Sequence, residues 1–404
     1  MKILHTADWH IGKVLHRQSL HDDISIFFDW LVKHITDKQI DLLLVSGDIF
    51  DLANPSNSDT KLYYHTLYRL SKTNVKIIIT GGNHDSISLL DAPSALLDVL
   101  DITVLGGARE HTQEEIIPIY GKDEKPDCIV LAVPFLRDKD LRQSLQASEM
   151  YDKSTIINDA IKQHYDDLVM MVIEKFGCSV PIIAMGHLYM KGSITSDSER
   201  EIHVGNLEGL DAKIIHPNIN YMALGHIHKP QKIGSNNHIR YSGSPVFLDF
   251  SERDYDKMVI EIEIEANKIK SITPVAIPKS REILKITGDL SAAKNMLMEY
   301  HNKYPLKAFV EIEIKETQFD VLKIQAMEDM IESIKSEEFK ILKNRIVFDN
   351  TPDAMNSIQN DTRTIQDLTP LDIFRQKLAE NNLNEKDITE LTDIYVSLME
   401  ELND

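Results

Sequence analysis

Five short apolar stretches of the sequence are each followed directly by residues that could bind a metal ion. The five groups are Asp8-Trp9-His10, Gly47-Asp48-Ile49-Phe50-Asp51, Gly82-Asn83-His84-Asp85, Gly186-His187 and Gly225-His226-Ile227-His228. Carboxylate, imidazole and amide groups are costly to bury unless something pairs with them, and a metal ion pairs with all three. Because the five groups contain no thiolate, they suit manganese, iron or zinc better than a soft metal, and their imidazoles make magnesium a poorer fit.

The arrangement of these groups indicates two ions. In open α/β sheets, ligands gather beyond the carboxyl ends of the strands, so placing the five turns at one sheet end brings about seven donors together. The i, i+2 spacing of Asp8 with His10, and of His226 with His228, puts both side chains of each pair on one side of an extended backbone. That many donors exceeds what one ion takes from protein while leaving room for substrate, so we expect two ions about 3.5–4 Å apart.

The prediction depends on the whole set of groups. A Gly-His pair such as Gly186-His187 is usually a turn, and Asp-x-His is equally unspecific, whereas Gly-Asn-His-Asp after an apolar strand is moderately specific. Of the 16 histidines, five fall in these groups. We expect the others to be surface or turn residues and assign them no role: His16, His34, His111, His164 and His301 are examples.

The elements that would position these residues follow an α/β pattern. Short apolar runs such as Ile77-Ile78-Ile79 predict buried strands, and the spacing of apolar residues predicts helices over 22–38 and 59–71. Alternating strands and helices favour an α/β core with helices packed on its sheets. Residues 238–274 differ, with strand-like alternation over Met258–Ile264 and few helix signals.

The sequence divides into four segments. Residues 1–278 form the domain that carries the candidate ligands, and residues 279–348 read strand, helix, strand, helix, strand, which predicts a small α/β domain. Residues 349–366 are rich in polar residues and predict a linker. Residues 367–404 predict two short amphipathic helices, the first capped by Thr369 with Pro370 following. These two helices either fold back on the body or dock on the helices of a partner.

Composition constrains the setting in which the protein works. The chain has 404 residues and a net charge of -20, so a phosphate-polymer substrate would need a local basic patch, metal ions or a partner subunit to overcome the repulsion. No apolar run approaches the roughly 18 residues of a membrane helix, and the first residues do not resemble a secretory signal. Cys128 and Cys178 show no CxxC spacing, so we expect two buried thiols in a reducing cytoplasm.

The five groups, taken in order, resemble the motifs of the calcineurin-like metallophosphoesterase superfamily. The opening His5-Thr6-Ala7-Asp8-Trp9-His10-Ile11-Gly12, together with Gly47–Asp51, is similar to the SbcD family of nuclease subunits of bacterial DNA repair complexes. The resemblance covers the whole chain, because that family also has a small capping domain and a C-terminal helical segment. It implies a two-sheet sandwich flanked by helices.

The resemblance also implies roles for individual residues. One metal would take Asp8, His10, Asp48 and His228, and the other would take Asp48, Asn83, His187 and His226. Asp48 would bridge the two ions, since a carboxylate has two oxygens and a charge that offsets the repulsion between two dications. His84 would donate a proton to the leaving sugar oxygen or contact the phosphate. Asp85 would orient His84 through a hydrogen bond or simply cap the turn.

The activity implied by the resemblance is that of a manganese-dependent nuclease. It would act as an exonuclease on double-stranded DNA ends and as an endonuclease on hairpin or single-stranded DNA. Its partner would be an SbcC-type coiled-coil ATPase, bound by residues 367–404, and it would form a homodimer through the nuclease domain. The dimer surface would be the first two predicted helices, although Phe27 and Phe28 there could equally be core.

Two other functions remain open from the sequence. A phosphodiesterase acting on a small nucleotide would use the same metal site and would suit the acidic composition better, but it would not need the additional domain and helical tail. A non-catalytic scaffold is the second alternative, and the intact set of ligand positions argues against it. Assays on a hairpin DNA and on a small phosphodiester would distinguish a nuclease from a small-molecule phosphodiesterase. Elemental analysis of metal content would distinguish a metal-dependent enzyme from a non-catalytic scaffold.

Overall fold

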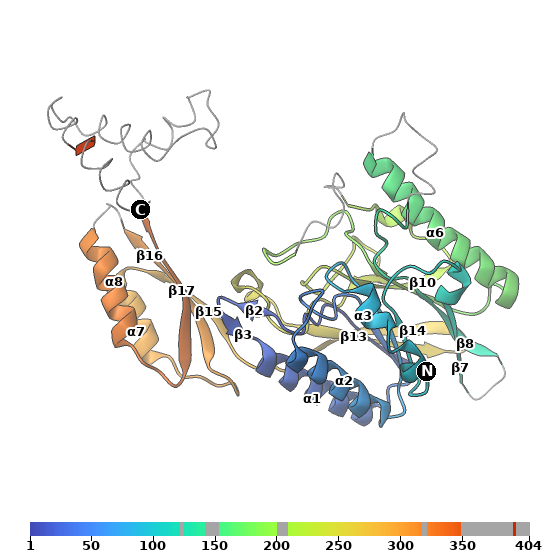
Figure 1. Cartoon of the computed structure of the whole chain (residues 1–404), viewed down its shortest axis with the longest axis horizontal. Helices are drawn as coiled ribbons and strands as arrows, with labels where there is room; N and C mark the ends of the chain where they lie inside the picture. The colour runs from blue at the N-terminus through green and yellow to red at the C-terminus, as the bar shows by residue number, and fades with distance from the viewer. Residues whose placement is uncertain (122–124, 142–152, 200–208, 317–320, 349–390, 393–404) are drawn as a thin grey trace, which may run out of the picture. The chain divides into compact units, whose positions relative to one another are not determined.

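The computed structural model describes residues 1–121, 125–141, 153–199, 209–316, 321–348 and 391–392 (Figure 1). The linker expected over 349–366 and almost all of the helical segment expected over 367–404 lie outside the described residues. Contacts within the chain separate two units. The first comprises Met1–Lys285, His301–Glu311 and Ser336–Lys343, and the second includes Ile286–Tyr300 and Ile312–Lys335.

The first unit contains a six-stranded sheet in the order β14-β13-β1-β4-β5-β6. Its strands are β1 (Lys2–Thr6), β4 (Leu42–Ser46), β5 (Lys76–Thr80), β6 (Ile102–Leu105), β13 (Met258–Glu265) and β14 (Lys268–Ala276). The strands β1, β4, β5 and β6 run parallel, and β13 and β14 extend the sheet in antiparallel fashion from β1. The carboxyl ends of β1, β4 and β5 therefore lie at one edge.

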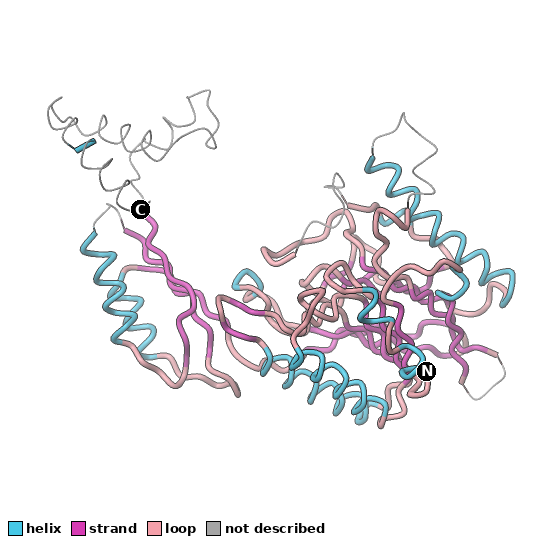
Figure 2. Tube along the Cα trace, in the orientation of Figure 1, coloured by secondary structure: helices cyan, strands magenta, loops and turns pink. Residues whose placement is uncertain are grey.

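A second six-stranded sheet has the order β11-β12-β10-β9-β8-β7. Its strands are β7 (Ile116–Tyr120), β8 (Pro126–Ala132), β9 (Ile182–His187), β10 (Ile219–Gly225), β11 (Gln231–Lys232) and β12 (Ile239–Tyr241). The strands β8, β9, β10 and β12 are parallel, and the outer strands β7 and β11 are antiparallel to their neighbours. Both sheets appear as magenta tubes in Figure 2.

The two sheets pack face to face, with helices on their outer faces. Alternate strand residues point to opposite sides of a sheet, so Leu42 and Leu44 of β4 face the second sheet, where they share a buried cluster with Ile183. Leu43 and Val45 face the other way, onto helices α1 (His21–Lys38) and α2 (Asn57–Ser71). Helix α6 (Lys153–Phe176) covers the outer face of the second sheet. The fold is thus the two-sheet sandwich that the resemblance implied.

Short elements complete the first unit. They are β2 (Val14–Leu15), β3 (Gln18–Ser19), α3 (Ile87–Asp91), α4 (Ser94–Asp98), η1 (Thr112–Glu115), η2 (Ala212–Ile214) and η3 (Phe250–Glu252). Helix α3 begins directly after the Gly-Asn-His-Asp turn, with the Ser86 hydroxyl accepting a hydrogen bond from Leu89 N as its cap. No helix among the described residues is long and apolar enough to span a membrane.

Three further strands and two helices follow in the order that the sequence predicts. Strands β15 (Ile283–Gly288), β16 (Ala308–Glu316) and β17 (Phe339–Phe348) form a sheet with β16 at its centre. Helices α7 (Leu290–Glu299) and α8 (Val321–Ser333) lie in the connections. Leu297 of α7, Met330 of α8 and Ile312 of β16 are buried, so this small α/β arrangement has apolar residues for a core of its own.

Two expectations about single residues are decided by burial. Cys128 on β8 is buried, but Cys178 is exposed, so the expectation of two buried thiols was wrong for Cys178. Cys178 lies in the turn between α6 and β9, where the chain crosses the surface. Phe27 and Phe28 of α1 were expected either at a dimer surface or in the core. Both are buried in the core of the first unit.

Candidate metal centre

The five predicted groups all follow the carboxyl ends of strands, but the strands belong to both sheets. Asp8, Asp48 and Asn83 follow β1, β4 and β5 of the first sheet, whereas His187 ends β9 and His226 follows β10 of the second. The loops are tied to one another by backbone hydrogen bonds, including Asp8 N to Gly47 O at 3.0 Å and His10 N to Asp48 O at 3.0 Å. The candidate site is therefore built where the two sheets meet.

Backbone conformation in these loops is unusual. Asp8, His10, Asp48 and His226 have φ angles of 53°, 44°, 49° and 97°, in the left-handed region that non-glycine residues seldom adopt. Each such residue costs about 1–3 kcal/mol, and such costs cluster at functional sites because the surrounding structure holds the conformation in place. Four of the converging side chains therefore come from strained backbone positions.

Two glycines allow the loops to come this close. A Cβ atom on Gly225 would lie 1.8 Å from Ser46 O, and one on Gly82 would lie 2.2 Å from Asp48 Oδ1. Both neighbours are held in place, the first because it is backbone and the second because Asp48 is buried. Any side chain at Gly225 would push the second sheet away from the first, so this glycine is needed for the convergence of ligands from both sheets.

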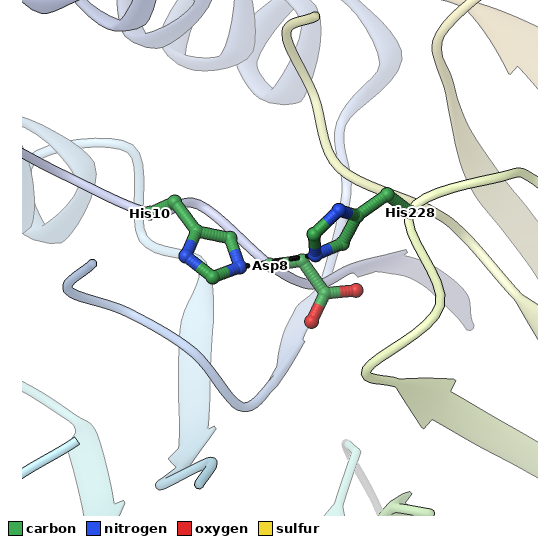
Figure 3. Close-up of side chains that lie close together, drawn as sticks. All are labelled: Asp8, His10 and His228. Atoms are coloured by element: carbon green, nitrogen blue, oxygen red, sulfur yellow. Dashed lines mark hydrogen bonds between the residues drawn. The ribbon is translucent and has the colours of Figure 1, made fainter. Parts of the chain in front are cut away.

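Asp8, His10 and His228 form one group of potential ligands (Figure 3). The three side chains are buried, and their ligand atoms lie within 4.8 Å of one another. The Nε2 atoms of His10 and His228 face each other at 3.1 Å. Asp8 Oδ2 is buried without a hydrogen-bond partner. Because an unpaired buried carboxylate oxygen is costly, the group is chemically incomplete as a set of protein atoms alone.

A second group contains Asp48, His187 and His226. His187 Nε2 lies 2.8 Å from Asn83 Oδ1 and 3.3 Å from Asp48 Oδ2. Asp48 Oδ2 also lies 3.6 Å from His10 Nε2, so Asp48 stands between this group and the first. The structure thus brings together all seven ligands expected from the sequence, in two groups with Asp48 between them.

Hydrogen bonds fix which ring nitrogen of three histidines can bind a metal. His10 Nδ1 lies 3.2 Å from Asp51 Oδ1, and His187 Nδ1 lies 3.1 Å from Ser46 O. A carbonyl oxygen can only accept, so His187 Nδ1 carries the proton, and the ionised Asp51 carboxylate imposes the same on His10. The Nε2 atoms of both rings point into the cluster, and in the neutral ring Nε2 carries the lone pair. Without a metal ion, His187 Nε2 faces the Asn83 and Asp48 oxygens and carries a proton as well. Neutral imidazole held in this way is the usual state of a metal-bound histidine.

His228 is held by a longer chain of contacts that includes Glu252. Ser198 Oγ donates to Glu252 Oε1 at 2.7 Å and lies 2.6 Å from His228 Nδ1. Because the single hydroxyl proton of Ser198 goes to the carboxylate, His228 Nδ1 must be the donor of the other bond, which leaves its lone pair on Nε2. Lone pairs at His10 and His228 that face each other across 3.1 Å repel unless a cation or proton lies between them. The residues therefore fit a divalent metal ion.

Charges within the cluster support the same conclusion. Burial raises the pKa of Asp8 to about 7, although His187 opposes this shift. Burial also opposes ionisation of Asp48, but the nearby His187 and His10 outweigh it and hold the pKa of Asp48 well below its usual range. Burial disfavours the charged form of His187, yet Asp48 and Asp8 raise its pKa to about 9. The cluster thus favours positive charge among its carboxylates, which bound divalent cations would supply.

His84 and Asp85 occupy different positions relative to this cluster. His84 is 7% exposed, and its Nδ1 donates to Asp51 O at 2.7 Å, so Nε2 is its second functional atom. Its ligand atom also lies within 4.8 Å of those of His10 and Asp48. The Asp85 carboxylate accepts the backbone N–H groups of Gly82, Ile49 and Phe50 at 2.8, 3.0 and 3.0 Å. These bonds join the loop after β5 to the loop after β4. Asp85 therefore caps the turn, which is the second of the two roles expected for it from the sequence.

Several residues that hold the ligands were not identified from the sequence. Asp51 lies within a recognised motif, and its carboxylate and carbonyl oxygens contact His10 and His84. Glu252 and Ser198 had no signal, because the short helix η3 and the irregular segment that carry them lie outside every ligand motif. Arg137, whose guanidinium donates to Asp85 O at 2.8 Å, was also missed. Only the three-dimensional path of these loops brings them to the site.

The chain is similar to known proteins along its whole length. The family model described as calcineurin-like phosphoesterase matches residues 1–230, and SbcD_C, described as type 5 capsule protein repressor C-terminal domain, matches residues 279–382. The SbcD subunit of the SbcCD nuclease from Escherichia coli strain K12 is 30% identical over 100% of this chain and 98% of its own length. The corresponding SbcD proteins from Rhodobacter capsulatus and Bacillus subtilis are 33% and 30% identical over 69% and 78% of this chain, and over 70% and 79% of their own lengths. The chain therefore belongs to the SbcD family of nuclease subunits within the calcineurin-like phosphoesterases, and it is a metal-dependent nuclease.

Proposed function

We propose that the chain cuts DNA phosphodiesters with two manganese ions, as the nuclease subunit that works with an SbcC-type ATPase. The observation that carries this proposal is the pair of ligand groups on either side of Asp48. A carboxylate between two groups of imidazoles suits two dications at short separation, since its charge reduces their mutual repulsion. The mixture of carboxylate, imidazole and amide oxygen suits manganese.

Each ion would have its own set of ligands. Asp8, His10 and His228 would hold one ion, and Asn83, His187 and His226 would hold the other, with Asp48 shared between them. When bound, the ions would lower the pKa of a water molecule and offset the charge that develops on the phosphate. Asp51, Ser46 and Ser198 would keep the imidazole protons on Nδ1, so that Nε2 stays available.

His84 would act on the leaving group. Its Nδ1 proton is committed to Asp51 O, so the proton that it donates to the departing sugar oxygen would come from Nε2. Asp51 would thus orient both His10 and His84, the first through its carboxylate and the second through its carbonyl oxygen. Asp85 would support His84 indirectly by joining its loop to the Asp48 loop.

A partner subunit would offset the negative charge of the chain. With a net charge of -20, the chain needs positive charge from elsewhere to hold DNA, and the ATPase subunit would supply part of it. Residues 367–404 would bind that ATPase, 279–348 would act as the capping domain and 349–366 would be the linker. We also propose a homodimer through the nuclease domain and a cytoplasmic location, in keeping with two free cysteines.

The test combines metal analysis with substrate choice. The purified protein is loaded with manganese, its metal content is measured, and hairpin DNA, double-stranded ends and bis(4-nitrophenyl) phosphate are compared with and without the ATPase subunit. We expect two ions per chain and cleavage of DNA that the ATPase subunit stimulates. Hydrolysis of the small ester or of a cyclic nucleotide, with DNA left intact under all conditions, would instead establish a small-molecule phosphodiesterase.

A further inference from the structure

A cavity of about 520 Å³ opens beside the metal centre in the first unit. Its lining includes Asn83 and His84 on one side, Ser86 and Ser88 at the start of α3, and Arg137 and Lys139 from the segment after β8. Cavities that hold a nucleotide-sized ligand span about 300–1,000 Å³, so this one has room for a single nucleotide. Because Asn83 and His84 line it, a ligand there would be continuous with a phosphate at the metals.

Arg137 is anchored so that its guanidinium is available at this cavity. Its backbone N–H donates to Asp140 Oδ2 at 2.9 Å, and one guanidinium nitrogen donates to Asp85 O at 2.8 Å. Two residues earlier, Phe135 N donates to Gly81 O at 2.9 Å, which ties the same segment to the turn after β5. A guanidinium has five N–H donors in a planar fork, so one bond to a carbonyl leaves donors for a phosphate.

The charges that line the cavity favour an anion. Arg137 is half-buried and Lys139 is exposed, and both are cationic. The one carboxylate in the lining belongs to Asp85, which is buried and whose oxygens are taken up by three backbone N–H groups of the protein. On a chain with a net charge of -20, a cationic cavity next to the metal ligands is the kind of local site that a phosphate polymer needs.

We propose that this cavity binds the nucleotide adjacent to the scissile phosphodiester, with the neighbouring phosphate on Arg137 and Lys139. The inference rests on the proposed function, because it takes a DNA strand as the substrate. The guanidinium fork would hold the phosphate and fix the register of the strand at the metals, while the serine hydroxyls offer further donors. Strand position would then be set by backbone phosphate contacts and not by base identity.

The test uses oligothymidylates in which a single cleavable phosphate lies in an otherwise neutral methylphosphonate backbone. In two further oligonucleotides, the methylphosphonate directly 5′ or directly 3′ of the cleavable phosphate is restored to a normal phosphate. The change in kcat/KM then gives the contribution of that one neighbouring charge. In the unsubstituted manganese-loaded protein, we expect one of the two restorations to raise kcat/KM about tenfold, the value of a charge-assisted hydrogen bond. In the Arg137→Gln, Lys139→Gln double variant, the same restoration should raise kcat/KM by less than about twofold.

The control is Lys175→Gln, which removes an exposed lysine near the end of α6. It should keep the full gain, since a loss there would mean that net charge alone is responsible. If the double variant keeps the tenfold gain while its rates fall equally on every substrate, Arg137 only braces the Asp85 loop and the proposal is wrong. The proposal also fails if neither restoration helps the unsubstituted protein. Hydrolysis of bis(4-nitrophenyl) phosphate without cleavage of any oligonucleotide would overturn the proposed function itself.

Discussion

Replacing Glu252 by glutamine should weaken metal binding, although Glu252 is not itself a proposed ligand. Glu252 is fully buried, and its Oε2 accepts from Lys257 Nζ at 2.5 Å and from Leu248 N at 3.0 Å. Its Oε1 accepts from Ser198 and lies 3.3 Å from His228 Nδ1. The carboxylate therefore compensates a lysine that is only 3% exposed and also holds the imidazole of a proposed ligand. Glutamine keeps the size of the side chain and removes its charge.

The size of the loss in stability and of the loss in metal affinity can be worked out from these contacts. Removing one partner of a buried ion pair costs about 3–5 kcal/mol, and we expect the lower value because the amide oxygen can still accept a bond. For a domain of this size, that loss lowers the melting temperature by about 5–10 °C. Removing a carboxylate that orients a metal-bound histidine weakens metal affinity about 10–100-fold, or about 1.4–2.7 kcal/mol.

The two effects are separated by a second substitution. In Glu252→Gln, Lys257→Met, no charge is left uncompensated, so the melting temperature should return most of the way to that of the unsubstituted protein. The metal affinity should stay low, because the carboxylate beside Ser198 and His228 is still absent. Melting of the full chain gives the first quantity, and calorimetric titration with manganese gives the second.

The results that would refute this reasoning are specific. If the double variant recovers both melting temperature and manganese affinity, Glu252 acts only by compensating Lys257, and the contact with His228 has no role. If Glu252→Gln loses stability without any change in affinity, the same conclusion follows. An affinity loss equal in both variants is the expected outcome.

Three further predictions concern other parts of the chain. His84→Ala should keep two manganese ions by elemental analysis and lose about 10²–10⁴-fold in turnover, as for a missing general acid; loss of an ion would make His84 a ligand, an option that its position near His10 and Asp48 leaves open. Deleting 367–404 should abolish binding of the ATPase subunit in a pull-down while metal-dependent hydrolysis of bis(4-nitrophenyl) phosphate continues, and undiminished binding would contradict it. Burial raises the pKa of Cys128 to about 12, so little of this thiol is ionised at pH 8. A disulfide reagent should therefore modify the exposed Cys178 at once and Cys128 only after unfolding. Rapid modification of both thiols in the folded protein would show that β8 is accessible.

The clustering of the proposed ligands could be predicted from the sequence because each of them lies next to a strong local signal. Asp8, Asp48 and Asn83 come directly after short apolar runs, and strand ends can be read from such runs without knowing the fold. The number of sheets could not be read in the same way. Periodicity predicts that residues 42–46 and 182–187 are strands, but it does not say that they lie in different sheets, and here the ligands come from both.

The supporting residues could not be predicted, since tertiary structure alone brings them to the site. Glu252 is 24 residues beyond His228 in sequence and belongs to the short helix η3, which has no pattern that marks it as functional. Arg137 lies in an irregular segment whose course is set by its hydrogen bonds to Asp85 and Asp140. Cys178 was misjudged because a neighbouring apolar run hid its position in a surface turn.

The close approach of Gly225 to Ser46 has a consequence for how the protein is made. His10 and His228 face each other although 218 residues separate them in the chain, so the first ligand group forms only after both sheets have folded and docked. Contacts of such long range are among the last to form, because the chain entropy of closing the loop must be overcome first. An incomplete or half-folded chain thus holds only part of each ligand set. The two proposed metal sites are therefore complete only in the folded chain, and nuclease activity requires that both sheets are in place.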